Sequence, residues 1–172
     1  MSSSGWNRVR RRLAGLEQEY GDFDVFEEET VVPRAVYTDC LQAAEAGSLG
    51  GARVVLRHDG EVLLVRYADR AEAWDFPGGS TERGESHENT ATFRTHEDVG
   101  AACTVTGVER VIEQSFALVE NGDGVSGLWV FFEGEPDDRD LTLSEEVLEA
   151  RWFDAADPPD AIGPHVAGIL DA

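Results

Sequence analysis

The sequence predicts an α/β fold in which a mixed β-sheet lies between helical layers, with a helical extension at the N-terminal end. Three observations lead to this prediction. Apolar residues among the first 20 positions recur at spacings of three and four, as on one face of a helix. From Ala52 onward the chain carries short runs of β-branched and apolar residues, as in strands. A helical stretch between Ser86 and Gly100 interrupts these runs, so strands and helices interleave.

The first 50 residues form the predicted extension. Its first helix carries an amphipathic stripe made of Trp6, Val9, Leu13, Leu16 and Tyr20. We expect this stripe to pack on the chain's own domain, with a homodimer interface as the alternative. The acidic segment 21–30 breaks the helix, and a second helix follows Pro33 and extends to about Ala46.

We therefore divide the chain into a helical extension, 1–50, and a domain, 51–172, with a flexible joint at 47–51. The domain begins with two β-branched runs on either side of Asp59-Gly60. Asp-Gly is a strong signal for a two-residue hairpin turn, so these runs predict a β-hairpin. The remaining predicted elements are a short strand at 74–76, a strand at 104–114, a hairpin of 116–119 and 128–133 around a turn at 120–127, a strand at 150–153 and a helix at 162–170.

Acidic residues dominate the composition. Asp and Glu number 35 against 14 basic residues, all of them Arg, and the net charge is −21. Such a surface repels nucleic acid and anionic membranes, so we expect neither as a partner. It also repels itself unless salt screens the charges, which favours a halophilic source and folding at high salt. An acidic protein from a GC-rich genome, in which Arg replaces Lys, is the alternative.

The N-terminal end carries no signal peptide that we can identify. Arginines occur at positions 8 and 10–12, but no apolar core follows them, and no run in the chain approaches the length of a membrane span. We expect a cytoplasmic protein.

The most informative segment is a glycine turn followed by a short helix. Gly78 and Gly79 allow a tight turn and the close approach of a ligand, because neither has a Cβ. Ser86 is a good helix N-cap, and Gly100 suits the left-handed residue that closes a helix. The segment therefore predicts a helix with a glycine-lined approach to its side.

Carboxylates lie at both ends of this predicted helix. Glu97 and Asp98 project close together from its last turn, and Glu85 lies at its start. Mg²⁺ typically takes one or two carboxylates together with the phosphate oxygens of a substrate. The segment is thus suited to holding Mg²⁺ against a phosphate.

These spacings resemble the Nudix box, G-x5-E-x7-R-E-U-x-E-E-x-G-U, in which U is a bulky aliphatic residue. With Gly79 on the first glycine, Glu85 falls on the first Glu, and Gly100 falls on the last glycine. Glu97 and Asp98 then fall on the Glu pair. The flanking sequences WDFPGG and ARWFD resemble the strands beside the box, and the resemblance covers residues 50–160. It implies the α/β/α sandwich of Nudix hydrolases.

The box, residues 79–101, is degenerate. Where the family has Arg-Glu, this chain has Phe93 and Arg94, and Thr95 and Ala101 occupy the U positions. One of three family carboxylates that share a helical face is thereby replaced by a cation, which should weaken metal binding.

Two contacts are open to the Arg94 side chain. An ion pair to Asp98, four residues later, would stabilise the helix by a few tenths of a kcal/mol. Alternatively, the guanidinium contacts a substrate phosphate directly.

The resemblance implies a hydrolase that uses Mg²⁺ or Mn²⁺ to cleave the pyrophosphate of a nucleoside diphosphate linked to another moiety. Its substrate would be a small-molecule nucleotide. Glu97 and Asp98 would be catalytic metal ligands, and Glu85 a third ligand or a helper. Gly79 would offer its carbonyl oxygen, and Arg94 would bind the substrate.

The alternative function is a catalytically impaired Nudix-fold module that binds a nucleotide or regulates a partner. A structural domain that assembles through its helical N-terminal end is a third option. Four carboxylates remain equal candidates for the general base, namely Glu120, Asp123, Glu145 and Glu146. Trp74 and Phe76 are candidates to stack on a base, although we expect Phe76 to pack in the core.

Overall fold

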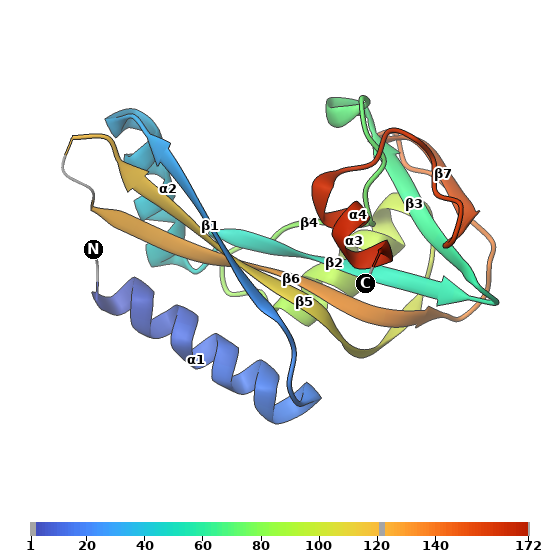
Figure 1. Ribbon diagram of the computed structural model, residues 1–172, viewed down its shortest axis with the longest axis horizontal. Helices are drawn as coiled ribbons and strands as arrows, with labels where there is room; N and C mark the ends of the chain where they lie inside the picture. Colours follow the sequence, from blue (N-terminus) through green and yellow to red (C-terminus); the bar gives the residue numbers. More distant parts are fainter. Residues whose placement is uncertain (1–2, 121–122, 172) are drawn as a thin grey trace.

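Seven strands pair into one mixed sheet in this computed structural model, which describes residues 3–120 and 123–171 (Figure 1). Six strands follow the order β1-β5-β6-β2-β3-β7, and β4 pairs with β2 beside this path. The predicted α/β class and mixed sheet are therefore confirmed. In chain order the elements are α1 (Ser3–Tyr20), β1 (Val25–Val32), α2 (Arg34–Ala46), β2 (Gly50–His58), β3 (Glu61–Tyr67), a short 3₁₀ helix (Ala68–Arg70), β4 (Gly78–Ser80), α3 (His87–Val99), β5 (Cys103–Leu118), β6 (Gly124–Pro136), β7 (Val147–Asp154) and α4 (Pro164–Leu170).

The sheet contains both parallel and antiparallel pairs. Strand β1 runs parallel to β5, and β2 runs parallel to β6, whereas the other pairs are antiparallel. The predicted hairpin of β2 and β3 is present. Its turn residues Asp59 and Gly60 have φ of 52° and 81°, the left-handed conformation that a two-residue hairpin turn requires.

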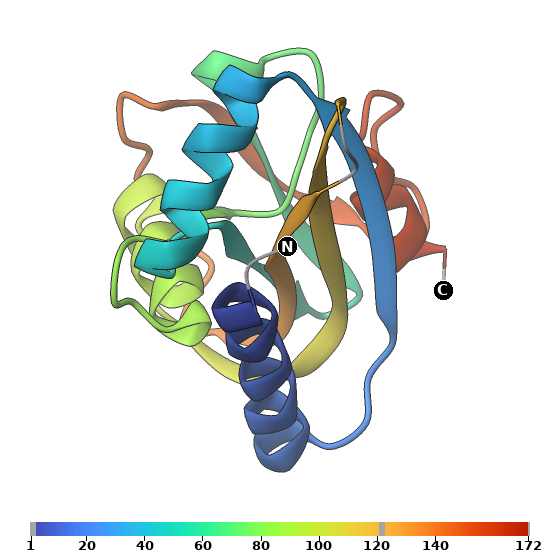
Figure 2. The same cartoon turned by 90° about the vertical axis from the view of Figure 1, so that its left-hand side faces the viewer.

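Helices cover both faces of the sheet, and each face has its own apolar cluster. Helices α1, α2 and α3 lie on one side and α4 lies on the other (Figure 2). The first cluster joins α1 and α3 to the sheet through residues that include Leu13, Leu16, Ala91 and Val99. The second cluster joins α4 to the opposite face through residues that include Phe76, Phe131, Val166 and Ile169.

The N-terminal extension is part of this sheet, which the sequence analysis did not predict. The acidic segment expected only to break a helix overlaps strand β1, whose eight residues are exposed except for Val32. Within the stripe of α1, Val9, Leu13 and Leu16 are buried in the chain's own core, so they are not free to form a dimer interface. The side chain of Trp6 lies outside the described part of the structure.

Three other boundaries differ from the prediction. The glycine-rich segment expected to be a flexible joint runs into β2, where Gly50 and Gly51 are both buried. Residues 74–76 form only isolated bridges, and the strand of this region is β4. Strand β5 is continuous over 16 residues, and β6 begins at Gly124, inside the expected turn.

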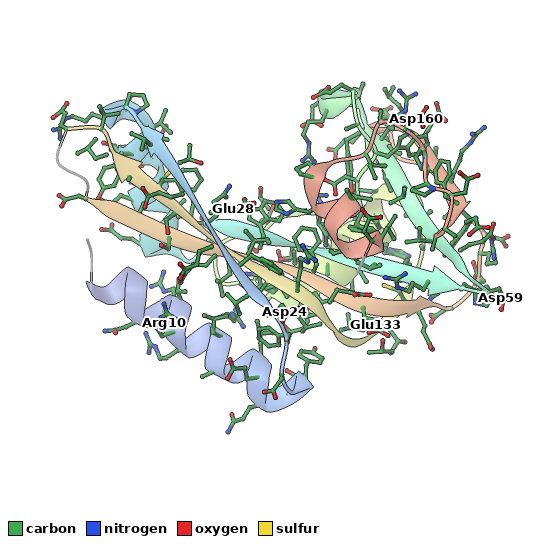
Figure 3. All side chains as sticks on the ribbon, viewed as in Figure 1. Arg10, Asp24, Glu28, Asp59, Glu133 and Asp160 are labelled. Atoms are coloured by element: carbon green, nitrogen blue, oxygen red, sulfur yellow. The ribbon has the colours of Figure 1, made fainter. Side chains whose placement is uncertain are left out.

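The negative charge is spread over the molecule. Figure 3 marks five exposed acidic residues: Asp24 and Glu28 lie just before and within β1, Asp59 in the turn between β2 and β3, Glu133 on β6 and Asp160 before α4. Among the described helices, none is long and apolar enough to cross a membrane.

Candidate active site

The predicted backbone of the glycine turn and of helix α3 is present. The Ser86 hydroxyl accepts a hydrogen bond from the Asn89 N–H, and Gly100 closes the helix with φ of 73°. At Gly78, φ is 144°, and a Cβ there would collide with the carbonyl oxygen of Ala52 in β2. Glycine is thus required at this position, because the turn presses directly against the neighbouring strand.

A buried tyrosine joins the turn to the helix. The Tyr67 hydroxyl lies 3.0 Å from Asp98 Oδ2, 3.0 Å from the Gly78 carbonyl oxygen and 3.0 Å from the Gly78 N–H, which donates to it. The hydroxyl carries one proton and faces two acceptor oxygens, so it can donate to only one of them at a time. Tyr67 therefore fixes Asp98 relative to the turn, a role that the sequence analysis missed.

The two adjacent carboxylates of the box lie in different environments. Asp98 is buried, with 2% of its surface exposed, whereas Glu97 is exposed to solvent. Burial raises the pKa of Asp98, the negative charges of Glu146 and Glu97 raise it further, and the contacts with Tyr67 and Arg94 oppose the shift. Asp98 is a fixed, poorly solvated carboxylate beside a solvent-exposed one.

Arg94 lies between two carboxylates. Its guanidinium is 3.7 Å from Asp98 Oδ2 and 3.6 Å from Glu146 Oε2, so the ion pair predicted from the i,i+4 spacing is present. The guanidinium also lies over Gly79, where a Cβ would come within 3.3 Å of Arg94 Nε. That Nε is buried and has no hydrogen-bond acceptor among the described residues. A ligand oxygen would supply the missing acceptor.

Three arginines line a cavity of about 580 Å³ beside this site. Arg94 and Arg70 contribute to its wall, and Arg53 on β2 contributes a nearly buried guanidinium. Arg53 donates to the Phe76 carbonyl oxygen at 2.9 Å, and its guanidinium carbon lies 5.1 Å from the centre of the Trp129 ring. Three carboxylates, Asp69, Glu82 and Glu146, line the same cavity. The cavity therefore combines guanidinium donors and carboxylates with an aromatic surface, and its guanidinium groups suit an anion that carries a ring.

A second, acidic cavity of about 440 Å³ adjoins the first. Four carboxylates line it, those of Glu97, Asp98, Glu145 and Glu146, and Arg94 is the cation among its lining residues. Arg94 and Glu146 line both cavities. A place for an anion thus borders directly on a place for a cation.

Glu85 lies apart from Glu97 and Asp98. It precedes the first turn of α3, and the helix rises by about 15 Å between His87 and Glu97. Its carboxylate accepts a 2.6 Å hydrogen bond from the Thr90 hydroxyl and a longer one from the Glu82 N–H. Glu85 therefore braces the loop that leads into α3, and the structure does not bring it to the other two carboxylates.

The other predicted residues have the following positions. The carbonyl oxygen of Gly79 faces strand β2, where a Cβ on Gly51 would collide with it. Glu120 forms an ion pair with Arg34 at the start of α2. Trp74 and Phe76 are buried in the apolar cluster around α4, so stacking on a ligand is not available to them.

Comparison with known proteins identifies the family. The NUDIX domain matches residues 49–171, most of the chain. The chain belongs to the NUDIX domain family. The elements that build the site, from β2 through the box helix to β7, all lie within the matched residues.

Solved structures of other proteins share the fold at low sequence identity. A NUDIX hydrolase from Nitrosomonas europaea is 22% identical with a TM-score of 0.54, and the alignment covers 69% of this chain and 65% of that one. An ADP-ribose pyrophosphatase from Streptococcus suis is 16% identical with a TM-score of 0.53, covering 70% and 87%. A UDP-X diphosphatase is 17% identical with a TM-score of 0.55, covering 96% and 78%. A search of curated proteins gives no match.

The NUDIX family implies a divalent metal, and the donor chemistry of the acidic cavity fits one. Carboxylate oxygens are the ligands that Mg²⁺ prefers, and four of these groups face a single cation here. Within residues 3–120 and 123–171, no three His, Cys, Asp or Glu side chains are already gathered around one point. Asp98 is fixed, whereas Glu97, Glu145 and Glu146 are exposed side chains that can rotate toward it.

Proposed function

We propose that the protein is a Nudix hydrolase that cleaves the pyrophosphate of a nucleoside diphosphate linked to another moiety. The observation that carries this proposal is the shared border of the two cavities. Arg94, with an unpartnered Nε, and Glu146 line both the arginine-rich cavity and the acidic one. A pyrophosphate held by the arginines would therefore lie beside the carboxylates that suit a divalent cation.

In this proposal the arginine-rich cavity binds the substrate. Arg94 and Arg70 contact the phosphate oxygens, because guanidinium groups donate paired hydrogen bonds to them. Trp129, which is half-buried in the wall, packs on the base or sugar. Arg53 holds the Trp129 ring in place and stays paired with Asp75 at 3.4 Å.

Glu97 and Asp98 would hold Mg²⁺ or Mn²⁺ together with Glu146. Such an ion, when bound, neutralises phosphate oxygens and lowers the pKa of a water molecule. Glu145 lines the same cavity, and in this proposal it takes a proton from water. Glu85 acts as a helper, because its bond to Thr90 fixes the loop before α3.

A hydrolysis screen tests the proposal. Nucleoside-diphosphate compounds are incubated with folded protein and Mg²⁺ or Mn²⁺ at high KCl, and products are followed by phosphorus NMR. Glu97→Gln should reduce metal-dependent turnover by at least about 100-fold, whereas Glu135→Gln, an exposed position on β6, should leave it unchanged. Equal rates for the two variants would remove Glu97 from the site.

One observation favours a second function, a nucleotide-binding module without turnover. The Arg94 guanidinium is within 4 Å of both Asp98 and Glu146, and it occupies the side of the acidic cavity where a metal would neutralise them. If folded protein binds a nucleoside diphosphate in the screen but releases no product, this second function is the correct one.

We further propose that the protein works at high salt in the cytoplasm of a halophile. The net charge of −21, with Arg as the basic residue throughout, supports this setting.

A further inference from the structure

A third cavity, of about 340 Å³, lies where the N-terminal helix meets the box. Helix α1, the C-terminal end of α2, the loop before α3 and the start of β6 surround it, and the three helices lie on one side of the sheet (Figure 2). Its charged or titratable lining residues are Arg8, Arg12, Glu85 and His87. None of the arginines of the candidate active site lines it.

His87 leaves a buried nitrogen without a partner. The ring is 93% buried, and its Nε2 lies 3.2 Å from the Leu128 carbonyl oxygen. A carbonyl oxygen only accepts, so Nε2 must carry the proton and donate. Burial, with the nearby charge of Arg12, lowers the pKa of His87 to about 4, so the ring is neutral. Nδ1 is then an acceptor, and no described residue donates to it.

The two arginines of the cavity are arranged differently. Arg8 donates to the carbonyl oxygens of Ala44 and Glu45 and so caps the end of α2. Arg12 is half-buried and forms no hydrogen bond or ion pair with any described residue, although the chain has 35 acidic residues. The carboxylate of Glu85 is engaged by Thr90 and Glu82. Arg12 therefore offers the cavity a guanidinium without an ion-pair partner among the described residues.

We propose that this cavity is a second anion site, which binds a hydrogen-phosphate group on Arg8 and Arg12 and accepts a hydrogen bond from the ligand's P–O–H at His87 Nδ1. The group is free phosphate or a phosphate monoester. A hydrogen phosphate has anionic oxygens for the two arginines and an O–H donor for His87 Nδ1. Sulfate has only the oxygens. The site thus distinguishes phosphate from sulfate by a proton.

Calorimetric titration without divalent metal tests the site independently of hydrolysis. Inorganic phosphate, adenosine 5′-monophosphate and sulfate are compared at constant KCl and about pH 6, near the second pKa of a phosphate monoester, where an O–H is present. Phosphate and the monophosphate should bind, and sulfate should bind at least about tenfold more weakly because it cannot donate to His87. Equal affinity for phosphate and sulfate would overturn the role of His87.

Three variants locate the binding. Arg12→Gln should weaken phosphate binding by roughly tenfold to 100-fold, the loss of a charge-assisted hydrogen bond. Arg11→Gln is the matched control, because Arg11 lies on the same helix outside this cavity. Arg94→Gln removes an arginine of the candidate active site and should leave this site intact. Equal losses for Arg11 and Arg12, or a loss with Arg94→Gln alone, would overturn the proposal.

His87→Gln tests the acceptor while keeping the fold. A glutamine amide can replace Nε2 as donor to the Leu128 carbonyl oxygen, but its own acceptor oxygen does not lie at the position of Nδ1. The variant should bind phosphate and sulfate equally well. In the parent protein, phosphate but not sulfate should move the nitrogen NMR signal of Nδ1. A folded protein that binds neither anion, or an unmoved Nδ1 signal at saturating phosphate, would refute the site.

Discussion

At position 94 a single side chain decides between two chemistries. In the Nudix box this position is a carboxylate, and here it is an arginine paired with Asp98 and Glu146. The guanidinium also lies over Gly79, and its Nε, beside the arginine-rich cavity, has no hydrogen-bond partner among the described residues. In the proposed site the arginine therefore reduces the negative charge available to a metal and adds a donor for a phosphate.

Arg94→Glu separates these two effects. If the arginine mainly opposes the metal, the variant should bind Mn²⁺ about tenfold more tightly, because a repelling charge becomes a ligand. If it mainly binds substrate, the Michaelis constant should rise by about tenfold or more. Metal titration and steady-state kinetics at high KCl measure both quantities. A variant unchanged in both would show that Arg94 only stabilises the helix.

Asp98→Asn tests the cost of burying a carboxylate. Because the folded protein raises the pKa of Asp98, it binds this proton more readily than the unfolded chain does. The resulting instability is present above the raised pKa and disappears as the pH falls below the ordinary pKa of aspartate. Asp98→Asn should therefore raise the free energy of unfolding by about 1 kcal/mol at neutral pH and lower turnover.

Urea denaturation of both proteins at constant KCl measures this difference. It should shrink toward zero as the pH falls below about 4, where the carboxyl is neutral in the unfolded chain as well as in the folded protein. A less stable Asn variant at neutral pH would mean that the contacts with Arg94 and Tyr67 outweigh the burial.

Single residues also show how far the sequence could lead. The ion pair of Arg94, the cap at Ser86 and the closing Gly100 follow from spacing along one helix, and all three are present. Tyr67 and Trp129 reach the site from strands distant in sequence. Their role depends on how the strands pair in the sheet, and the spacing of residues along the sequence does not reveal that pairing.

Elements were predicted well where one face is buried and poorly where pairing alone holds them. The apolar stripe of α1 and the hairpin of β2 and β3 have clear periodicity and were found. Strand β1 has a run of three glutamates and seven exposed residues, so its sequence carries no strand alternation. It is a strand because its backbone pairs with that of β5, from Val25 opposite Val111 to Val32 opposite Leu118.

Leu16→Ala tests whether α1 is integral to the fold. Leu16 is 2% exposed within the cluster that joins α1 to the sheet. The substitution should lower the free energy of unfolding by about 2–5 kcal/mol, as for other buried leucines. Leu143→Ala, at a position 42% exposed, should change it by less than about 0.5 kcal/mol. Similar small effects of both, in urea denaturation, would mean that α1 is a loosely attached appendage.

The charge of the whole molecule governs its stability in salt. With a net charge of −21 spread over the surface, carboxylates repel one another at low ionic strength. The Debye length falls from about 8 Å at 0.15 M salt to about 3 Å at 1 M, so most of this repulsion is screened. The thermal midpoint should therefore rise by about 10 °C or more over this range of KCl.

Neutral substitutions on β1 provide the control for salt. Glu27→Gln with Glu29→Gln removes two exposed charges from the sheet edge, so the midpoint of this variant should depend less steeply on KCl. If the midpoint of the parent protein does not change with KCl, the acidic surface is not a salt adaptation.

The pairing of β1 with β5 has a consequence for synthesis. Strand β1 is synthesised before β5, its only described partner strand, and β5 is not complete until Leu118. Until then its three consecutive glutamates keep β1 solvated and oppose its pairing with strands of other chains, because like charges repel. Strand β1 can therefore join the sheet only after β5 has been synthesised, so folding of this protein depends on long-range contacts.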